Sequence, residues 1–202
     1  EAIDIYRRLV RANPASYTAD LARALNILTL NLNRGGRMNE ALAAVQEAVT
    51  IYRSLAQIDP AAYKPDLAAC LHNVATCLGD TGHRSAALAA IRETTTIRRE
   101  LAERDPATHA PALAPCLHRL AKRLAEAGHR GEALETAREA VDLYRSLARR
   151  RPEAFRQGLA DTLGTYASVL QWAGKESDAA RIRQEVEDVT LQMEIEASGG
   201  SF

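Results

Sequence analysis

Ile51-Tyr52-Arg53-Ser54-Leu55 is the stretch that decides the fold, because similar stretches return at a fixed interval along the chain. The corresponding stretches begin at Ile5, Ile97 and Leu143, so each step is 46 residues long. Three further columns keep this register: Pro14, Pro60, Pro106 and Pro152; Gly36, Gly82, Gly128 and Gly174; Ala41, Ala87, Ala133 and Ala179. A period of this length predicts a repeat protein, in which each repeat is one structural unit stacked on its neighbours.

Each repeat contains two helical patterns. The second pattern is the clearer one, since Ala41, Val45, Ala48, Tyr52 and Leu55 follow one another at spacings of four and three residues and form one helical stripe. Pro60 ends that helix, and Pro65 suits the first turn of the next one. We expect helices over residues 1–12, 16–34, 38–58, 65–80, 84–104, 112–126, 130–150, 156–172 and 175–195. Pro115 follows Pro111 by four residues, which predicts a late or irregular start for helix 112–126.

No segment alternates with period two, so no strand is expected. A single helix pair cannot bury both of its apolar faces, whereas stacked pairs can. The fold class predicted is therefore all-α, a right-handed superhelical solenoid of antiparallel helix pairs with about nine helices. The array is expected to be a single domain over 1–197, with repeats 1–46, 47–92, 93–138 and 139–184, a partial capping unit over 185–197, and a flexible tail over 198–202.

Composition narrows the class of protein. The 202 residues carry 26 Lys+Arg and 26 Asp+Glu, and this neutrality disfavours a dedicated nucleic-acid binder. No apolar run is long enough for a membrane span. Arginine greatly outnumbers lysine, which is typical of a GC-rich bacterial source. The first residue is Glu1, within a helical pattern, so we expect a piece of a longer protein.

Motifs for catalysis, metals or cofactors are missing from the sequence. It has no phosphate-binding glycine loop, no His-Glu-x-x-His and no Cys-x-x-Cys, so we expect no enzyme activity, no cofactor and no metal. His72 and His118 share one repeat position, which explains them without a metal. Cys70, Cys77 and Cys116 are interpreted as buried, unpaired residues of a cytoplasmic protein, since Cys70 and Cys77 lie too far apart along a helix to be bridged.

The pattern resembles the tetratricopeptide repeat. Its large, small and turn positions are filled by Leu71, Val74, Ala75, Leu78, Gly82 and Ala87, and the same places are filled one and two repeats later. The period is longer than the usual 34 residues, which resembles kinesin-light-chain-type repeats and the arrays of actinobacterial signalling proteins. The resemblance implies a non-catalytic scaffold or sensor module that binds a protein or peptide segment, as part of a larger bacterial regulatory protein.

In the family that this sequence resembles, ligands commonly lie along the concave face against the first helix of each repeat. The polar columns expected on that face give a candidate groove of Asn26, Leu30, His72, Asn73, Thr76, His118, Arg119 and Lys122. Its cationic part, Arg119 and Lys122, favours an acidic segment or a chain terminus. The alternative is that these residues are only solvated polar positions.

The two ends of the array differ. Ile3, Ile5, Tyr6 and Leu9 belong to a helix without its pair, so a second hypothesis is a structural module that forms homodimers through this uncapped N-terminal edge. At the other end, Arg149-Arg150-Arg151 closes helix 130–150. The positive charge of these arginines stabilises the C-terminal end of the helix, which is the negative end of its dipole. A weaker alternative is that they form a phosphate or RNA site.

Overall fold

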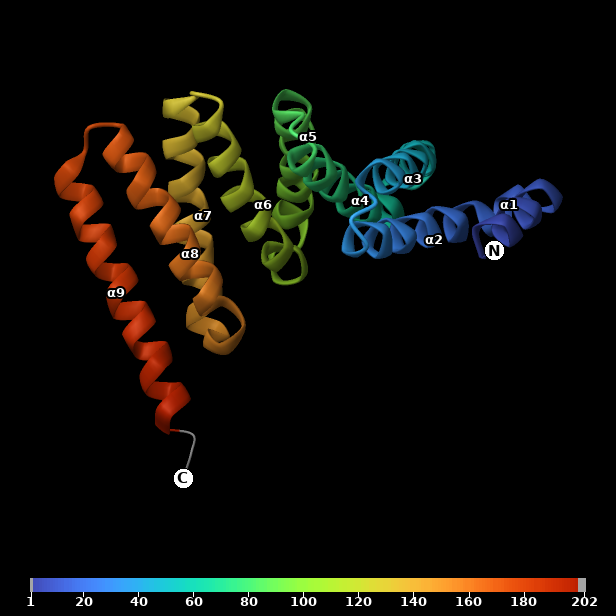
Figure 1. The fold of residues 1–202 in the computed structure, drawn as a ribbon. Coiled ribbons are helices and arrows are strands. Elements are labelled where there is room, and N and C mark those ends of the chain that lie inside the picture. Colours follow the sequence, from blue (N-terminus) through green and yellow to red (C-terminus); the bar gives the residue numbers. More distant parts are fainter. Residues whose placement is uncertain (1, 200–202) are drawn as a thin grey trace. The chain divides into compact units, whose positions relative to one another are not determined.

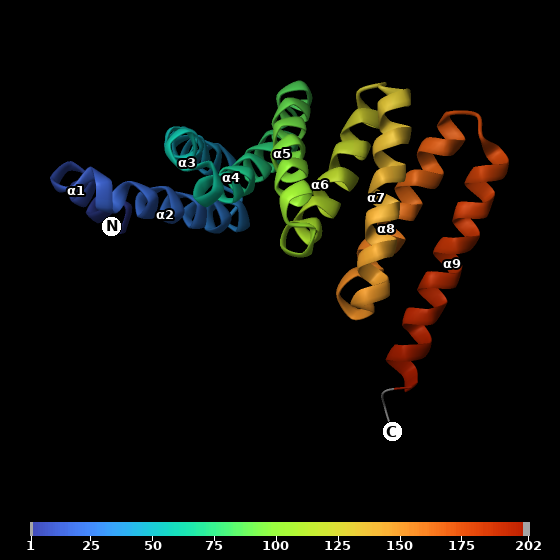
Figure 2. The same ribbon diagram turned by 180° about the vertical axis from the view of Figure 1, so that it is seen from behind.

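The computed structural model describes residues 2–199, and all of the regular structure in this range is helical (Figures 1 and 2). The chain divides into two compact units, unit 1 over residues 1–104 and unit 2 over residues 105–202. The all-α class predicted from the repeat is confirmed over the described part. The single array expected over 1–197 stays a prediction, and each unit is described by itself.

Unit 1 contains five helices joined by short turns, so that each helix runs antiparallel to the one before it (Figure 1). They are α1 (Ala2–Ala12), α2 (Pro14–Arg34), α3 (Met38–Ile58), α4 (Pro60–Asp80) and α5 (Arg84–Arg104). Each helix packs on its successor, and α2 also touches α4. Because α2 and α4 are both first helices of a repeat, they run parallel.

Unit 2 repeats this arrangement with four helices (Figures 1 and 2). They are α6 (Pro106–Glu126), α7 (Arg130–Arg150), α8 (Pro152–Trp172) and α9 (Glu176–Gly199). The parallel helices α6 and α8 touch each other in the same way as α2 and α4. Helix α9 begins at Glu176 and ends at Gly199, which corrects the predicted bounds of 175–195, and residues 200–202 of the expected tail lie outside the described range.

The first helix of each repeat starts earlier than predicted. Pro60 and Pro106 occupy the first helical position, preceded by Asp59 and Asp105, whose carboxylates accept the amides of Ala62 and Thr108. A proline at this position loses nothing, because the first amides of a helix have no partner within it. The predicted starts at residues 16, 65, 112 and 156 are therefore wrong, and the helices begin at 14, 60, 106 and 152.

Three prolines lie inside helices instead of starting them. Pro65 falls within α4, and Pro111 and Pro115 fall within α6, which runs without a break from Pro106. The late or irregular start expected for this helix is thus wrong. Each internal proline removes one amide donor from its helix. The cap at Asp105 and the apolar face of α6, which includes the buried Leu117, hold the helix together.

Four glycines make the turns between the paired helices. Gly36, Gly82, Gly128 and Gly174 have φ angles between 71° and 84°, the left-handed conformation that strains any residue with a Cβ. This confirms the turn position that the repeat pattern assigns to Gly82. The same turn precedes each second helix, so α3, α5 and α7 have the predicted bounds of 38–58, 84–104 and 130–150.

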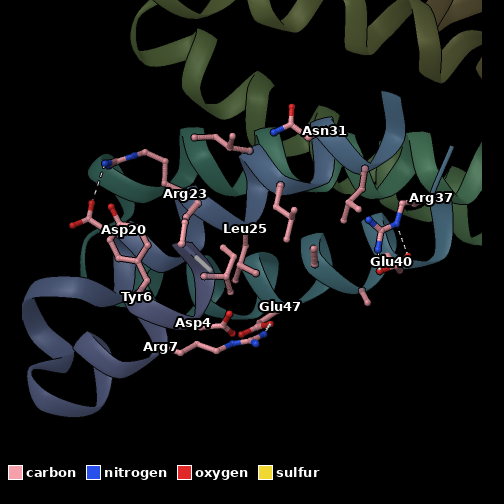
Figure 3. A pocket seen from close by; sticks show the side chains of 18 residues that line it. Asp4, Tyr6, Arg7, Asp20, Arg23, Leu25, Asn31, Arg37, Glu40 and Glu47 are labelled. Atoms are coloured by element: carbon pink, nitrogen blue, oxygen red, sulfur yellow. Dashed lines mark hydrogen bonds and ion pairs between the residues drawn. The ribbon is translucent and has the colours of Figure 1, made fainter. Parts of the chain in front are cut away.

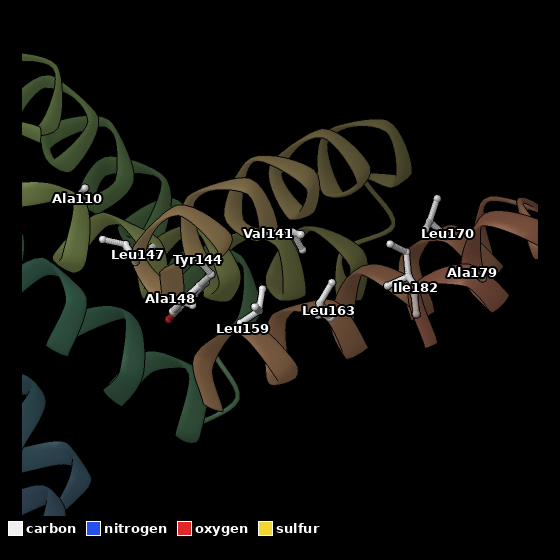
Figure 4. Close-up of a cluster of buried hydrophobic side chains, with 12 residues drawn as sticks. Ala110, Val141, Tyr144, Leu147, Ala148, Leu159, Leu163, Leu170, Ala179 and Ile182 are labelled. Atoms are coloured by element: carbon white, nitrogen blue, oxygen red, sulfur yellow. The ribbon is translucent and has the colours of Figure 1, made fainter. Parts of the chain in front are cut away.

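Small residues allow the helices to approach closely. Ala41, Ala87, Ala133 and Ala179 are all fully buried at one repeat position. In unit 2 the core includes Val141 and Tyr144 from α7, Leu163 from α8 and Ile182 from α9 (Figure 4). Tyr144 fits against Gly158, where an added Cβ would lie 2.5 Å from its ring. Cys70, Cys77 and Cys116 are buried and form no disulfide, as predicted, and burial raises the pKa of the Cys70 thiol to about 12.

Ion pairs join successive second helices at a constant spacing. Arg7 pairs with Glu47 and Arg53 with Glu93 in unit 1, at 2.7 and 2.8 Å. Arg145 binds both carboxylate oxygens of Glu185 in unit 2, at 2.9 and 2.6 Å. Each pair joins residues 40 positions apart, so the repeat also includes side-chain contacts.

No helix between residues 2 and 199 is long and apolar enough to cross a membrane.

Candidate functional site

The groove between α6 and α8 is the best-formed candidate site in unit 2. It has a volume of about 670 Å³ and lies between two parallel first helices. The side chains that line it come from both helices: His118, Lys122, Ala125 and Glu126 from α6, and Asp161, Thr165, Ser168, Val169 and Trp172 from α8. The groove therefore combines one cation, two carboxylates, three other polar groups and an apolar wall.

His118 connects the two helices and is not free to bind a ligand through its ring nitrogens. Its Nδ1 lies 2.7 Å from the hydroxyl of Thr162, and its Nε2 lies 3.3 Å from the hydroxyl of Thr165. Burial lowers the pKa of His118, while the charge of Asp161 opposes this effect. The imidazole is thus held in place and favoured in its neutral form, with a structural role between α6 and α8.

Lys122 is the cation in this groove that is available to a ligand. Its side chain is exposed and has no ion pair within residues 2–199, whereas neighbouring Glu126 is paired with Arg123 at 2.9 Å. Lys122 can therefore donate to an incoming carboxylate or carbonyl group.

Trp172 provides the apolar end of the groove. It lies at the C-terminal end of α8 and remains 38% exposed, which is high for the largest aromatic side chain. The guanidinium carbon of Arg130 lies 4.5 Å from the ring centroid, so one region of the indole is held in a cation–π contact. With Val169 and Ala125, the indole offers an apolar surface within the same cavity as Lys122.

A second hollow adjoins the groove on α6. It has a volume of about 350 Å³, and its lining includes Arg119, Lys122, Arg123 and Tyr144. Burial raises the pKa of Tyr144, so its hydroxyl stays protonated. Lys122 lines both cavities, which makes it the central charged residue of this surface.

Five of the eight predicted groove residues lie in unit 1, on α2 and α4. The amide of Asn73 donates to the side-chain oxygen of Asn26 at 2.8 Å, so these two residues join the parallel helices. Thr76 donates to the backbone carbonyl of His72, and both are half-buried. Leu30 is exposed. In unit 2, His118, Arg119 and Lys122 do lie together, and their contact with a ligand stays a prediction.

Sequence reasoning missed the contribution of α8 to the unit 2 groove. Thr165 and Ser168 occupy the columns of Asn73 and Thr76, which the repeat predicts to face the groove, but the predicted site does not include them. Trp172 has no such signal, because Arg34, Asp80 and Glu126 occupy its column in the other repeats. That Trp172 lines the groove follows only from the structure.

The N-terminal edge of unit 1 contains a larger cavity, of about 1030 Å³, between α1, α2 and α3 (Figure 3). Its charged side chains are joined in the pairs Arg7–Glu47, Arg23–Asp20 and Arg37–Glu40. Ile27 and part of α1 supply its apolar lining, and Ile27 is 54% exposed. This is the surface on which the homodimer hypothesis depends, and dimer formation stays a prediction.

The described residues contain no candidate metal site, because nowhere among them do three His, Cys, Asp or Glu side chains come together.

The class of protein defined by this fold and groove is an α-helical repeat array with interaction surfaces formed by parallel helices. The sequence profile of the tetratricopeptide repeat matches residues 67–107, across α4 and α5. This match supports the resemblance to the tetratricopeptide repeat that the repeat pattern indicated.

Several solved structures have a fold similar to that of this chain. Kinesin-light-chain-type repeats from Podosopora anserina match with a TM-score of 0.66 and 16% identity, over 96% of this chain and 87% of theirs. MamA matches with a TM-score of 0.62 and 13% identity, over 95% of this chain and 88% of its own. Apo RapI matches with a TM-score of 0.68 and 15% identity, over 96% of this chain and 64% of its own.

At these identities the likeness concerns the fold alone, a tetratricopeptide-type solenoid. None of the curated proteins matches the sequence. The fold is one that protein-interaction scaffolds use, and the choice of partner has to be argued from this chain's own side chains.

Proposed function

We propose that this chain is a non-catalytic recognition module that binds a protein or peptide segment in the groove between α6 and α8. One observation carries the proposal: an unpaired lysine, Lys122, and an exposed indole, Trp172, line one cavity of about 670 Å³. An apolar wall with a few convergent polar groups is typical of a binding site. Its volume suits a few side chains of a ligand rather than a whole domain.

The groove sets conditions on its ligand. Lys122 favours an acidic side chain or a chain terminus, and Trp172 with Val169 favours an apolar side chain next to it. His118 acts by keeping α6 and α8 at a fixed distance, because both of its ring nitrogens face hydroxyl groups of α8. Binding then requires little rearrangement, which limits the entropy lost on association. A role within a larger bacterial regulatory protein is part of the same proposal.

Peptide selection tests the groove. Random peptides displayed on phage are selected against the whole chain, and fluorescence anisotropy measures the affinity of each selected peptide for the wild type and for Lys122→Glu/Trp172→Ala. We expect the double variant to lose about tenfold or more in affinity, because interface anchors of these types commonly contribute this much.

The matched control is Lys175→Glu/Leu191→Ala, which makes a similar change at exposed positions away from the groove. It should leave the affinity within about twofold, and circular dichroism should give all three proteins the same helix content. Selected peptides that bind the groove variant as tightly as the wild type would exclude this groove as the binding site.

A further inference from the structure

A cationic cavity lies at the other end of α8, where α7, α8 and α9 meet. It has a volume of about 440 Å³. Arg145, Arg149 and Arg156 lie around it, and Ala148, Leu159 and Val189 provide apolar lining. Ala148 and Leu159 are buried, so the floor of the cavity is formed by core residues while its edge is charged.

The arginines at this place differ in whether they are paired. Arg145 binds Glu185 through two hydrogen bonds, and Arg156 pairs with Glu196. The side chains of Arg149, Arg150 and Arg151 are exposed, and none has a hydrogen bond or ion pair with any residue between 2 and 199. Three adjacent guanidinium groups thus point into solvent at the turn between α7 and α8.

The repeat itself provides a reference for this cluster. Ninety-two residues earlier, in unit 1, Gln57, Asp59 and Glu100 stand at the positions of Arg149, Arg151 and Gln192. All three differences make the unit 2 site more positive. The cation at the position of Arg156 is paired in both units, Lys64 with Glu100 in unit 1 and Arg156 with Glu196 in unit 2. The excess of positive charge over the equivalent place in unit 1 therefore comes from Arg149 and Arg151 and from the loss of the carboxylate at position 192.

One of these differences removes a stabilising contact. Asn13, Asp59 and Asp105 each cap the following helix by accepting a backbone amide, whereas Arg151 makes no side-chain cap for α8. Arginine has no acceptor group and cannot cap a helix N-terminus. An N-cap residue with an acceptor side chain is present at three of these turns and is replaced by Arg151 at the fourth. Such a departure indicates that the residue is needed for something other than stability.

We propose that the cationic cavity, lined by Arg149, Arg156, Leu159 and Val189, binds an acidic segment of a partner protein, together with the exposed Arg151 that precedes Pro152 of its lining. Arginine stays charged at all physiological pH values and binds carboxylates through two parallel hydrogen bonds. The apolar floor accommodates one aliphatic side chain of the segment between its acidic residues. A peptide fits better than a nucleic acid, because the chain has no net charge and no aromatic side chain lines this cavity for a base to stack on.

The probe is a fluorescein-labelled peptide of glutamates with one central leucine, titrated into the whole chain at low ionic strength. The variant Arg149→Gln/Arg151→Asp carries the residue types that unit 1 has at these positions. We expect it to bind the probe about tenfold more weakly, and raised salt should weaken wild-type binding in the same direction. Its thermal midpoint should equal or exceed that of the wild type, because the introduced carboxylate restores the missing cap of α8.

The matched control is Arg8→Gln/Arg11→Asp, which makes the same change in charge at exposed positions of α1. It should bind the probe as the wild type does. Arg149→Gln alone, expected to give part of the loss, serves as a second variant. The groove variant Lys122→Glu/Trp172→Ala should also retain the probe, so failure of one site is distinguishable from failure of the other.

Three results would overturn the proposal. The wild type could fail to bind the probe at any concentration tested, or the α1 control could weaken binding as much as the double variant, which would show attraction to net charge only. A single-stranded RNA oligonucleotide could also bind at the same arginines and displace the peptide, which would assign the site to phosphates instead of carboxylates.

Discussion

Glycine has two separate functions in this chain. At the four turns it allows a positive φ, and at Gly158 it leaves room for the ring of Tyr144 on the neighbouring helix. Gly164 has neither function, because its φ is not positive and an added Cβ would meet no atom within 4 Å. The repeat pattern identifies the turn glycines in the sequence. The different roles of Gly158 and Gly164 can be identified only from the packing around them.

Alanine substitutions on α8 should therefore have opposite effects. Gly158→Ala should lower the free energy of unfolding by about 1–3 kcal/mol, because the new methyl group overlaps Tyr144 in a packed core. Gly164→Ala should raise it by about 0.5–1 kcal/mol, since alanine favours the helix more than glycine does. Urea denaturation of both variants measures the difference, and equal effects would contradict the packing described for Tyr144.

At the scale of helices, parallel neighbours are joined by polar contacts that change from one unit to the other. In unit 1, Asn73 of α4 donates to Asn26 of α2, and the thiol of Cys77 donates to Asn33. In unit 2, His118 of α6 contacts Thr162 and Thr165 of α8. Among these side chains, histidine is the one that ordinarily titrates near neutral pH.

His118 should make the stability of the chain depend on pH. Its pKa in the folded protein is lowered by burial, so the unfolded chain takes up the proton more readily than the folded one. The contribution is complete above the unfolded pKa of about 6.5 and is lost as the pH falls through the lower, folded value. Urea denaturation from pH 7.5 to pH 5 should show a smaller loss for His118→Asn than for the wild type; parallel profiles would count against a buried neutral imidazole.

The bounds of the helices show what a repeat pattern can predict. The bounds of α3, α5 and α7 agree with the prediction because a turn glycine and a proline mark the two ends of each, whereas α9 has no proline after it and runs beyond its predicted end. The predicted starts of α4 and α6 are too late because Pro65 suits a first turn and the Pro111–Pro115 pair indicates a late start, whereas the signal lies in the capping residues before Pro60 and Pro106. The hydrogen bonds of His118 could not be predicted, since they depend on the offset between two parallel helices.

At the scale of the whole molecule, stability is distributed along the chain. The core cluster that contains Val141, Tyr144, Leu163 and Ile182 is made of residues from 105–202. In a repeat protein the total stability is close to a sum of repeat and neighbour contributions, so a part with its own core can fold by itself.

Residues 105–202 produced alone should be helical and should unfold cooperatively, at a lower temperature than the whole chain because fewer helix interfaces remain. Far-UV circular dichroism and a thermal scan, with residues 1–104 measured in parallel, would check this. A gradual melt without a transition would mean that unit 2 depends on residues outside it.

The constant spacing of the turns also determines which changes in the gene the fold can tolerate. Every described repeat closes with a glycine of positive φ at a 46-residue interval, so one repeat can follow another without a change in the geometry of the junction. A duplication or deletion of one full period in the gene would therefore lengthen or shorten the array by one helix pair. A single inserted codon within a helix would instead rotate the following side chains by about 100° and turn the buried stripe toward solvent. Unequal recombination between repeats is thus the mutation that this architecture tolerates best, and the number of repeats is the character most open to change between lineages.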